Sequence, residues 1–176
     1  MKAFCFLFIF LPSIFAFAQS RPYRNSSRPV TKPSFTYDLG ASTGNYNNRS
    51  YTEIQLGLNW FLQEYFIWRN ALFTRFGTGS ESAAGLDTSA RLNYDSPGEN
   101  GGLGLNVFAG PGYRISKTEN TGVFGEAGIT LRASGLAVGV GVKSIQYNSP
   151  GTDSLGRDLP KTDTSVFLIL AAGGAF

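Results

Sequence analysis

The 176-residue sequence contains no histidine and only one cysteine, Cys5. Histidine is the side chain most often used as a general base, and histidine and cysteine supply most protein ligands of transition metals. Their scarcity excludes a hydrolytic triad or dyad in its usual form and argues against a transition-metal site. A carboxylate pair such as Asp38 and Glu53 would be available for acid–base chemistry, but ion pairing explains it more simply. We therefore expect no catalytic residue, no cofactor and no metal, and a protein that is not an enzyme.

Long apolar stretches are lacking beyond the N-terminus. The longest, Val166 to Phe176, is shorter than the roughly 20 residues that a membrane-spanning helix needs. The first 18 residues combine Lys2, an apolar run from Ala3 to Phe15 and a terminal Ala-Phe-Ala, which is typical of a cleaved secretory signal. We expect a mature chain that begins at Gln19 and has no cysteine. An uncleaved anchor helix is the alternative, and the shortness of the apolar run disfavours it.

Charge is also scarce, at 15% of the residues with a net charge of +3, and this balance gives no reason to expect a nucleic-acid partner. Residues 19–33 contain three prolines and four basic residues without periodicity, which predicts a flexible leader. This leader is either a plain spacer or a contact with anionic lipid or cell-wall polymer, and we favour the spacer. The predicted organisation is a signal at 1–18, the leader at 19–33 and one domain at 34–176.

From Ser34 onward, apolar and polar residues alternate with a period of two, which predicts β-strands with one apolar face. Turn-forming stretches separate eight such segments, each about as long as the 9–11 residues that a tilted strand needs to cross a bilayer. The pattern predicts an all-β fold, an eight-stranded antiparallel up-and-down transmembrane β-barrel. The alternating segments are Phe35–Ser42, Glu53–Trp60, Tyr65–Phe76, Leu86–Leu92, Leu105–Arg114, Val123–Leu131, Leu136–Lys143 and Val166–Phe176.

Alternation alone allows two opposite proteins. A soluble ligand-binding barrel turns its apolar face inward, whereas a membrane barrel turns it outward. The polar face mixes charged residues with glycines such as Gly57, Gly112 and Gly141, and the narrow interior of an eight-stranded barrel requires small neighbours around large side chains. The other face carries almost no charge and would aggregate in water. We therefore expect the apolar face to point outward.

Aromatic residues near the strand ends predict two outward girdles. One set comprises Phe35, Tyr37, Trp60, Phe61, Tyr65, Phe66, Trp68, Tyr94 and Phe176. The other comprises Tyr46, Tyr51, Phe76, Tyr113 and Tyr147. Girdles of this kind lie at the two membrane interfaces of transmembrane barrels. The simpler explanation, that aromatics favour strands, does not account for the aliphatic and glycine-rich middles of the later strands.

The charged residues of the polar face are nearly balanced in sign, and they should pair across strands. An unpaired ion in a narrow, poorly hydrated interior costs several kcal/mol. We expect Glu53 or Glu126 within reach of an inward arginine, and a salt-bridged plug; a charged pore constriction is the alternative, which a barrel of this width disfavours. The predicted interior network is Asp38, Glu53, Asp87 and Glu126 with Arg69, Arg75, Arg91, Arg114 and Lys143.

With its signal-like N-terminus, eight alternating segments and C-terminal Phe176, the chain resembles the small eight-stranded outer-membrane barrels typified by the OmpA transmembrane domain and OmpX, and more distantly OmpW. The resemblance implies that Phe176, with Leu170 and Leu168 at alternate positions, forms the signal recognised by the barrel-assembly machinery. Gly174 departs from the bulky residue usual in that signal.

The resemblance also implies an outer membrane of a Gram-negative bacterium, with lipid around the barrel and both termini in the periplasm. The expected role is a membrane scaffold or surface-loop interaction protein, and an extracellular partner would bind the long connection at 148–164. The alternative is a narrow channel for small or apolar solutes. The sequence does not indicate an oligomeric state.

Overall fold

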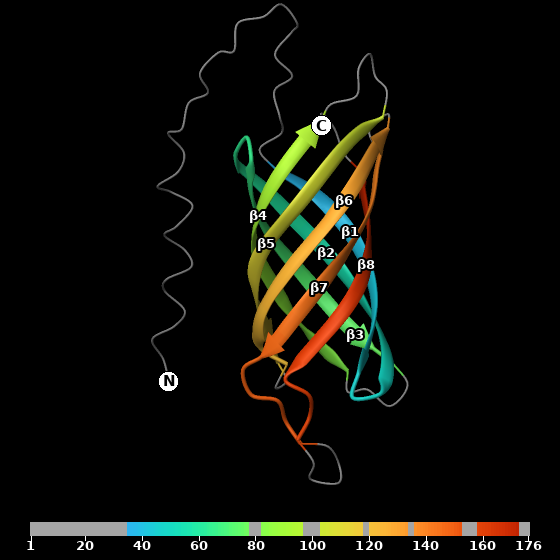
Figure 1. Cartoon of the computed structure of the whole chain (residues 1–176), viewed down its shortest axis with the longest axis vertical. Coiled ribbons are helices and arrows are strands. Elements are labelled where there is room, and N and C mark those ends of the chain that lie inside the picture. The colour runs from blue at the N-terminus through green and yellow to red at the C-terminus, as the bar shows by residue number, and fades with distance from the viewer. Residues whose placement is uncertain are drawn as a thin grey trace, which may run out of the picture. The chain divides into compact units, whose positions relative to one another are not determined.

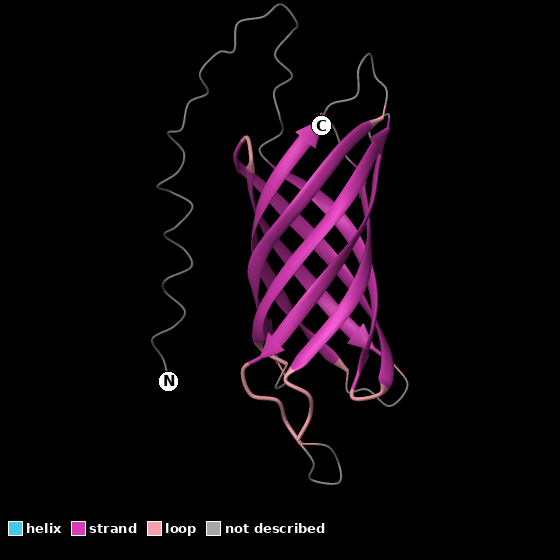
Figure 2. Ribbon diagram, viewed as in Figure 1, coloured by secondary structure: helices cyan, strands magenta, loops and turns pink. Residues whose placement is uncertain are grey.

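Eight antiparallel strands form a closed barrel in the order β1-β2-β3-β4-β5-β6-β7-β8 (Figures 1 and 2). The computed structural model describes residues 35–77, 82–96, 103–117, 120–133, 136–152 and 158–172. The predicted all-β, up-and-down barrel is therefore confirmed. The strands are β1 (Phe35–Tyr46), β2 (Arg49–Gln63), β3 (Phe66–Phe76), β4 (Ala83–Ser96), β5 (Gly104–Ser116), β6 (Gly122–Ala133), β7 (Leu136–Tyr147) and β8 (Thr162–Ala172).

The predicted signal, the predicted leader and Phe176 lie outside the described residues. Within the described ranges, no helix is long and apolar enough to cross a membrane. Most strands extend beyond the alternating segments seen in the sequence. β2 begins at Arg49, and β8 begins at Thr162, inside the stretch predicted as a loop.

Each strand pairs with its neighbour in sequence, and β8 pairs with β1 from Asp38↔Ala171 to Gly44↔Ser165, which closes the barrel. The terminal rim is the end at which β1 begins and β8 ends. The distal rim is the opposite end, the lower one in Figure 1, and it carries the β1–β2, β3–β4, β5–β6 and β7–β8 connections. Closure leaves no sheet edge unpaired, so the backbone hydrogen bonds of the strands are satisfied within the wall.

The register slips steadily around the barrel. From Gly44 in β1, successive pairings reach Gly110 in β5 after half a circuit and Phe61 in β2 after seven strands. Phe61 is one residue beyond the Phe35↔Trp60 pair that begins the β1–β2 pairing. The circuit therefore closes ten residues from its start. A slip of this size inclines the strands of a small barrel by about 35–45° to its axis. The intermediate partners are Ser165, Lys143, Glu126, Gly110, Arg91, Ile67 and Phe61.

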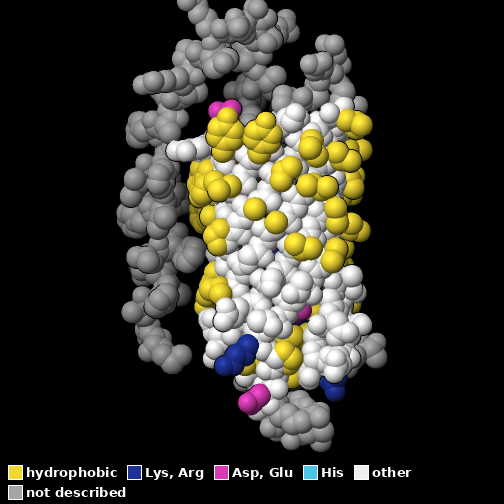
Figure 3. All heavy atoms as spheres, in the orientation of Figure 1, with side chains coloured by type: hydrophobic (Ala, Val, Ile, Leu, Met, Phe, Trp, Pro, Cys, Tyr) yellow, Lys and Arg dark blue, Asp and Glu magenta, His cyan; other side chains and the backbone are white. Residues whose placement is uncertain are grey.

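The barrel has apolar side chains on its outer surface and charged side chains in its interior, the reverse of a soluble protein with an apolar core. Leu56, Leu72 and Leu92 on the outer wall are 57%, 63% and 66% exposed, whereas Arg114 and Lys143 in the interior are 0% and 1% exposed. Within the described strands, no charged residue occupies an outward-facing position. Figure 3 shows apolar side chains over the upper part of the visible wall and few charged ones, most of them near the two ends. The apolar face therefore points outward, as the sequence predicts.

Four of the predicted girdle residues point inward, so the girdle prediction is wrong for them. Tyr51 and Tyr147 are 2% and 3% exposed, Tyr46 packs against Tyr147, and Phe61 lines an interior cavity. The barrel interior must be filled at its ends as well as in its middle, and large rings do this. The aromatic residues exposed on the outer wall near the rims include Phe35, Tyr37, Trp60, Tyr65, Tyr94, Phe76 and Tyr113.

Glycines make room for aromatic rings in the interior. A Cβ at Gly141 would meet the Phe167 ring and lie 2.5 Å from the Ala127 carbonyl oxygen, and a Cβ at Gly128 would lie 2.6 Å from Cζ of Phe108. Phe108 and Phe167 stack with ring centroids 6.3 Å apart. The bare backbone at these glycines therefore lets the stacked rings lie flat against the wall and fill the interior.

This packing predicts that Gly141→Ala destabilises the barrel by about 1–3 kcal/mol, because the added methyl overlaps the Phe167 ring and a backbone oxygen. The matched control is Gly125→Ala in β6, where a Cβ would have no atom within 4 Å. Urea unfolding followed by the fluorescence of Trp60 and Trp68 measures both variants. Equal unfolding midpoints for the two variants would contradict the proposed packing.

Candidate functional site in the barrel interior

The barrel interior holds a balanced set of buried charges. The described residues include five buried acids and five buried bases. All nine residues of the predicted interior network lie there, and Asp163 of β8 is the tenth. The acids are Asp38, Glu53, Asp87, Glu126 and Asp163, and the bases are Arg69, Arg75, Arg91, Arg114 and Lys143.

Arg114 lies at the centre of the network. Its guanidinium donates to both oxygens of Glu53, at 2.8 and 2.7 Å, and to both oxygens of Asp87, each at 2.7 Å. Lys143 donates a further bond of 2.8 Å to Asp87, and Arg75 donates one of 3.2 Å to Glu53. These bonds join β2, β3, β4, β5 and β7 across the interior. Bidentate pairs of this kind fix geometry as well as charge, because the planar guanidinium fork matches a carboxylate.

A second cluster lies nearer the terminal rim. Arg69 donates to the two oxygens of Asp38, at 2.6 and 3.1 Å, and Asn59 donates to Asp38 at 2.7 Å. A Cβ at Gly57 would lie 2.5 Å from Asp38 Oδ1 and 2.7 Å from Arg69 Nη2. Gly57 therefore provides the space in which this pair meets. Gln55 links the cluster to the central one, since it accepts from Arg69 at 3.4 Å and donates to Glu53 at 2.7 Å.

Glu126 forms a third cluster on the opposite wall. Arg91 donates to both of its oxygens, at 2.8 and 3.0 Å, and the Ser89 hydroxyl donates at 2.6 Å. The Arg91 guanidinium also lies 4.3 Å from the centroid of the Phe108 ring. Burial of this pair therefore comes with hydrogen bonds and an aromatic face, which offset part of the cost of removing two ions from water.

The distal end is sealed around Asp163. One oxygen of this carboxylate accepts from Tyr51 at 2.8 Å, from Tyr147 at 3.0 Å and from Arg75 at 3.0 Å. Tyr46 packs edge-on against Tyr147 and donates to the Pro160 carbonyl at 2.8 Å, which ties the β7–β8 connection to the barrel. The three rings and one ion pair occupy the distal end of the interior.

Aromatic faces cover three further cations in the same way. Arg75 lies 3.8 Å from the Tyr51 ring centroid, Arg114 lies 3.8 Å from that of Phe73, and Lys143 lies 4.8 Å from that of Phe124. A cation over a ring gains electrostatic stabilisation without needing water. The cations are thus held by carboxylates on one side and rings on the other.

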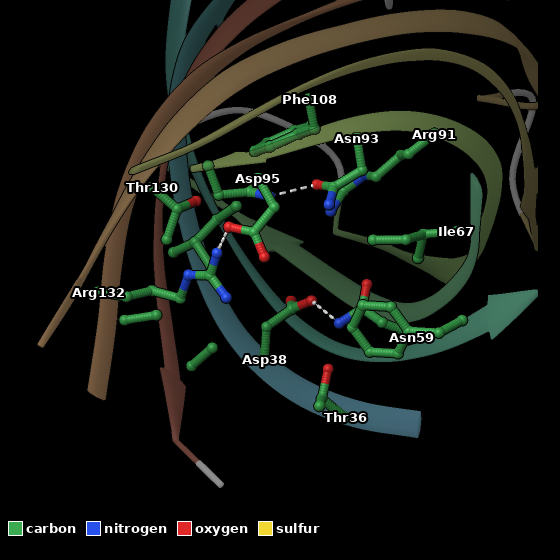
Figure 4. A pocket seen from close by; sticks show the side chains of 15 residues that line it. Thr36, Asp38, Asn59, Ile67, Arg91, Asn93, Asp95, Phe108, Thr130 and Arg132 are labelled. Carbon is green, nitrogen blue, oxygen red and sulfur yellow. Dashed lines mark hydrogen bonds and ion pairs between the residues drawn. The ribbon is translucent and has the colours of Figure 1, made fainter. Parts of the chain in front are cut away.

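The terminal end contains a small cavity of about 90 Å³, lined by both polar and apolar side chains (Figure 4). Asp95 and Arg132 pair in its wall, and Asn106 donates to Asn93 at 2.6 Å. Asp38 and Arg91 form part of its lining and face the second and third clusters. Because a water molecule needs only about 10–15 Å³ of such volume, the cavity accommodates a few waters. Because Asp38 and Arg91 line the cavity, its inner boundary is formed by the ion pairs of the second and third clusters.

The chemistry of the interior is that of a filled, paired network. Each of the five buried carboxylates accepts a hydrogen bond from at least one cation. Asp163 does so through Oδ2 alone, and its Oδ1 is buried without a hydrogen-bond partner. Among the described residues, no group of three or more aspartate, glutamate, histidine or cysteine side chains is placed to hold a metal ion. The arrangement therefore crosslinks the strands.

The sequence alone does not predict three charged residues of the interior or the tyrosine cap, which consists of Tyr46, Tyr51 and Tyr147 at the distal end. Asp163, Asp95 and Arg132 were all placed in turn-forming stretches because glycine, proline and polar residues surround them. The signal that could have found Asp163 is its place in the alternation of β8, since it is two residues before Ser165 and four before Phe167, which both point inward. Alternation also places Tyr51 and Tyr147 on the charged faces of β2 and β7.

No known protein family, curated protein or solved structure matches the chain. A barrel fold by itself does not specify a function. The function must therefore be argued from the outer wall, the interior and the connections of the barrel.

The network predicts that Glu53→Ala costs about 3–5 kcal/mol in unfolding free energy, because Arg114 and Arg75 lose a shared buried partner. Asp158→Ala, which removes an exposed carboxylate, is the matched control and should change stability by less than about 0.5 kcal/mol. Urea titration of the folded protein measures both. An unchanged midpoint for Glu53→Ala would show that the pairing does not support the barrel.

Proposed function

We propose that the protein is an integral β-barrel of a bacterial outer membrane, with a closed, salt-bridged interior, acting as a scaffold that presents surface loops. The observation that carries the proposal is the polarity of the wall, whose outward positions in the described strands carry leucine, valine, isoleucine and aromatic side chains and no charge. Arg49 is exposed at the distal start of β2, but it belongs to the inward-facing series of that strand. Soluble proteins rarely expose a contiguous apolar patch of more than a few hundred Å². A lipid environment makes the same surface favourable, and a closed barrel satisfies its backbone there.

The interior supports a scaffold over a channel. A path through an eight-stranded barrel would have to follow the glycine-lined wall, but the rings of Phe108, Phe124 and Phe167 lie against Gly128, Gly112 and Gly141. The tyrosines around Asp163 occupy the distal end. A narrow channel for small or apolar solutes remains the second candidate, supported by the terminal cavity. No catalytic role is part of the proposal.

The up-and-down topology sorts the connections. With both termini in the periplasm, the distal rim faces the cell exterior and carries the long β7–β8 connection. Its described part contains a bridge between Thr152 and Asp158, and Asn148 donates from its backbone to the Thr121 carbonyl at 2.9 Å. These bonds hold the base of the connection against the rim. Loops on a rigid frame are the usual location of binding specificity, so we place any extracellular partner here.

The experiment is single-channel recording with purified protein in planar bilayers, combined with flotation of the same sample on lipid vesicles. We expect flotation with the vesicles and currents indistinguishable from the protein-free bilayer, because the ion-pair clusters and tyrosine cap block the interior.

Two outcomes would contradict the proposal in different ways. Stable unitary conductance steps would favour the channel over the scaffold. Recovery as a detergent-free monomer that does not float would overturn the membrane assignment itself. Heat-dependent mobility on gels provides the control that the sample is a folded barrel.

A further inference from the structure

The outer wall differs between two sides of the barrel near the distal rim. On β4, β5 and β6 the outward positions there are mostly apolar and include Leu86, Ile115 and Val123, of which Ile115 and Val123 are 43% and 48% exposed. On β7, β8, β1 and β2 the outward positions near the same rim carry only uncharged polar side chains, all exposed. These are Ser144, Gln146, Thr162, Thr164, Thr43, Asn45, Ser50 and Thr52, and we call this surface the polar wall.

The two surfaces lie at the same height, although strand inclination obscures this. The pairings lead from Gly44 in β1 to Gly110 in β5 after half a circuit, and half of the ten-residue slip is five residues. The residue of β5 level with Gly44 is therefore Ile115. Its apolar side chain faces outward at a height between Thr43 and Asn45, and β1 and β5 lie on opposite sides of an eight-stranded closed barrel.

The terminal end shows no comparable difference. There, outward positions are apolar on both sides, from Tyr37, Trp60 and Val138 on one to Val107 and Leu131 on the other. The apolar band is therefore taller on the β4–β6 side than on the polar wall. In Figure 3, which views the side of β5 to β8, the lower part of the wall has few apolar side chains whereas the upper part is covered with them.

We propose that the barrel lies inclined in the bilayer, with the distal part of the β4–β6 side in hydrocarbon and the polar wall among the lipid headgroups. This inference rests on the proposed function. A bilayer normal parallel to the barrel axis would either expose Leu86, Ile115 and Val123 to water or bury the polar wall in hydrocarbon, and both are unfavourable. Inclination moves the distal part of the β4–β6 side into hydrocarbon and lifts the polar wall to the headgroups, while it brings the terminal apolar positions of β5 and β6, such as Leu105 and Leu131, to the opposite interface.

The headgroup layer is the occupant that the chemistry of the polar wall fits. Its hydroxyl and amide groups can donate and accept hydrogen bonds, as sugar, phosphate and glycerol groups require, and it carries no charge of its own. It is also continuous with the apolar band below it, so no separate partner is needed to cover it. Ser144 and Thr164 already pair with each other across β7 and β8, at 3.4 Å.

The test uses the full chain with Cys5→Ser and one added cysteine at a time: Ile115→Cys, Thr43→Cys, Asn45→Cys and, in the middle of the apolar band, Leu56→Cys. Each variant is spin-labelled and reconstituted in phosphatidylcholine vesicles. Collision rates with oxygen, which enters hydrocarbon, and with a water-soluble nickel chelate report the depth of each label. All four positions face outward, so the labels do not disturb the interior.

We expect collisions with the chelate to be several-fold rarer at position 115 than at 43 and 45, with oxygen showing the reverse order. Equal accessibility at 43, 45 and 115 would overturn the inclination while leaving the membrane assignment intact. Free access of the chelate to position 56 would overturn the membrane assignment. Protection of 43 and 45 from both reagents, with dipolar broadening between labels, would assign the polar wall to contact with a second copy and overturn the headgroup proposal.

Discussion

The structure depends on one constraint, which is that a narrow closed interior must hold ten buried charges with little access to water. An isolated ion in such a place costs several kcal/mol, so each carboxylate has to meet a cation with good geometry. Arg114 meets this requirement by sharing its guanidinium between Glu53 and Asp87. The glycines follow from the same constraint, because Gly57 leaves room for the Asp38–Arg69 pair that a larger residue would displace.

The same constraint also crosslinks the strands through the interior. The central cluster links strands that are not neighbours in the sheet, such as β2 with β5 through Glu53 and Arg114, and β4 with β7 through Asp87 and Lys143. Backbone pairing holds each strand to its two neighbours, and these side-chain bonds hold it to more distant ones. A barrel crosslinked through its interior is a rigid support, and variation at its connections leaves the support unchanged.

Much of this was predictable from the sequence, and the exceptions have a physical cause. Period-two alternation predicts the strands, their number and the inward direction of Arg69, Arg114 and Glu126, because it depends only on strand geometry. Composition misled at the strand ends. Asp163 follows a stretch rich in glycine, proline and charge, so the start of β8 was taken for a loop. Position at a strand end predicts Tyr51 and Tyr147 as outward girdle residues, whereas the alternation of each strand places them on its inward face.

The sequence predicts that acids and bases pair across the interior, but it does not predict which acid pairs with which base. Sequence separation does not show that Glu53 meets Arg114, since the inclination of the strands decides which inward positions share a level. The near balance of four acids and five bases was the best available indication, and Asp163 completes it. Alternation likewise gives the inward direction of Tyr51 and Tyr147 but not their shared partner Asp163, because these hydrogen bonds join three strands at the rim.

The central claim is that the apolar wall faces lipid while the charged interior stays closed. The most direct measurement is nuclear magnetic resonance of the protein in lipid nanodiscs, with a nitroxide on the lipid chains in one sample and an aqueous gadolinium chelate in another. The account predicts that the chain nitroxide broadens the methyl signals of Leu56, Val140 and Leu168, and that the chelate leaves these methyls and the Arg114 guanidinium unaffected. Broadening of the three methyls by the aqueous chelate would contradict it.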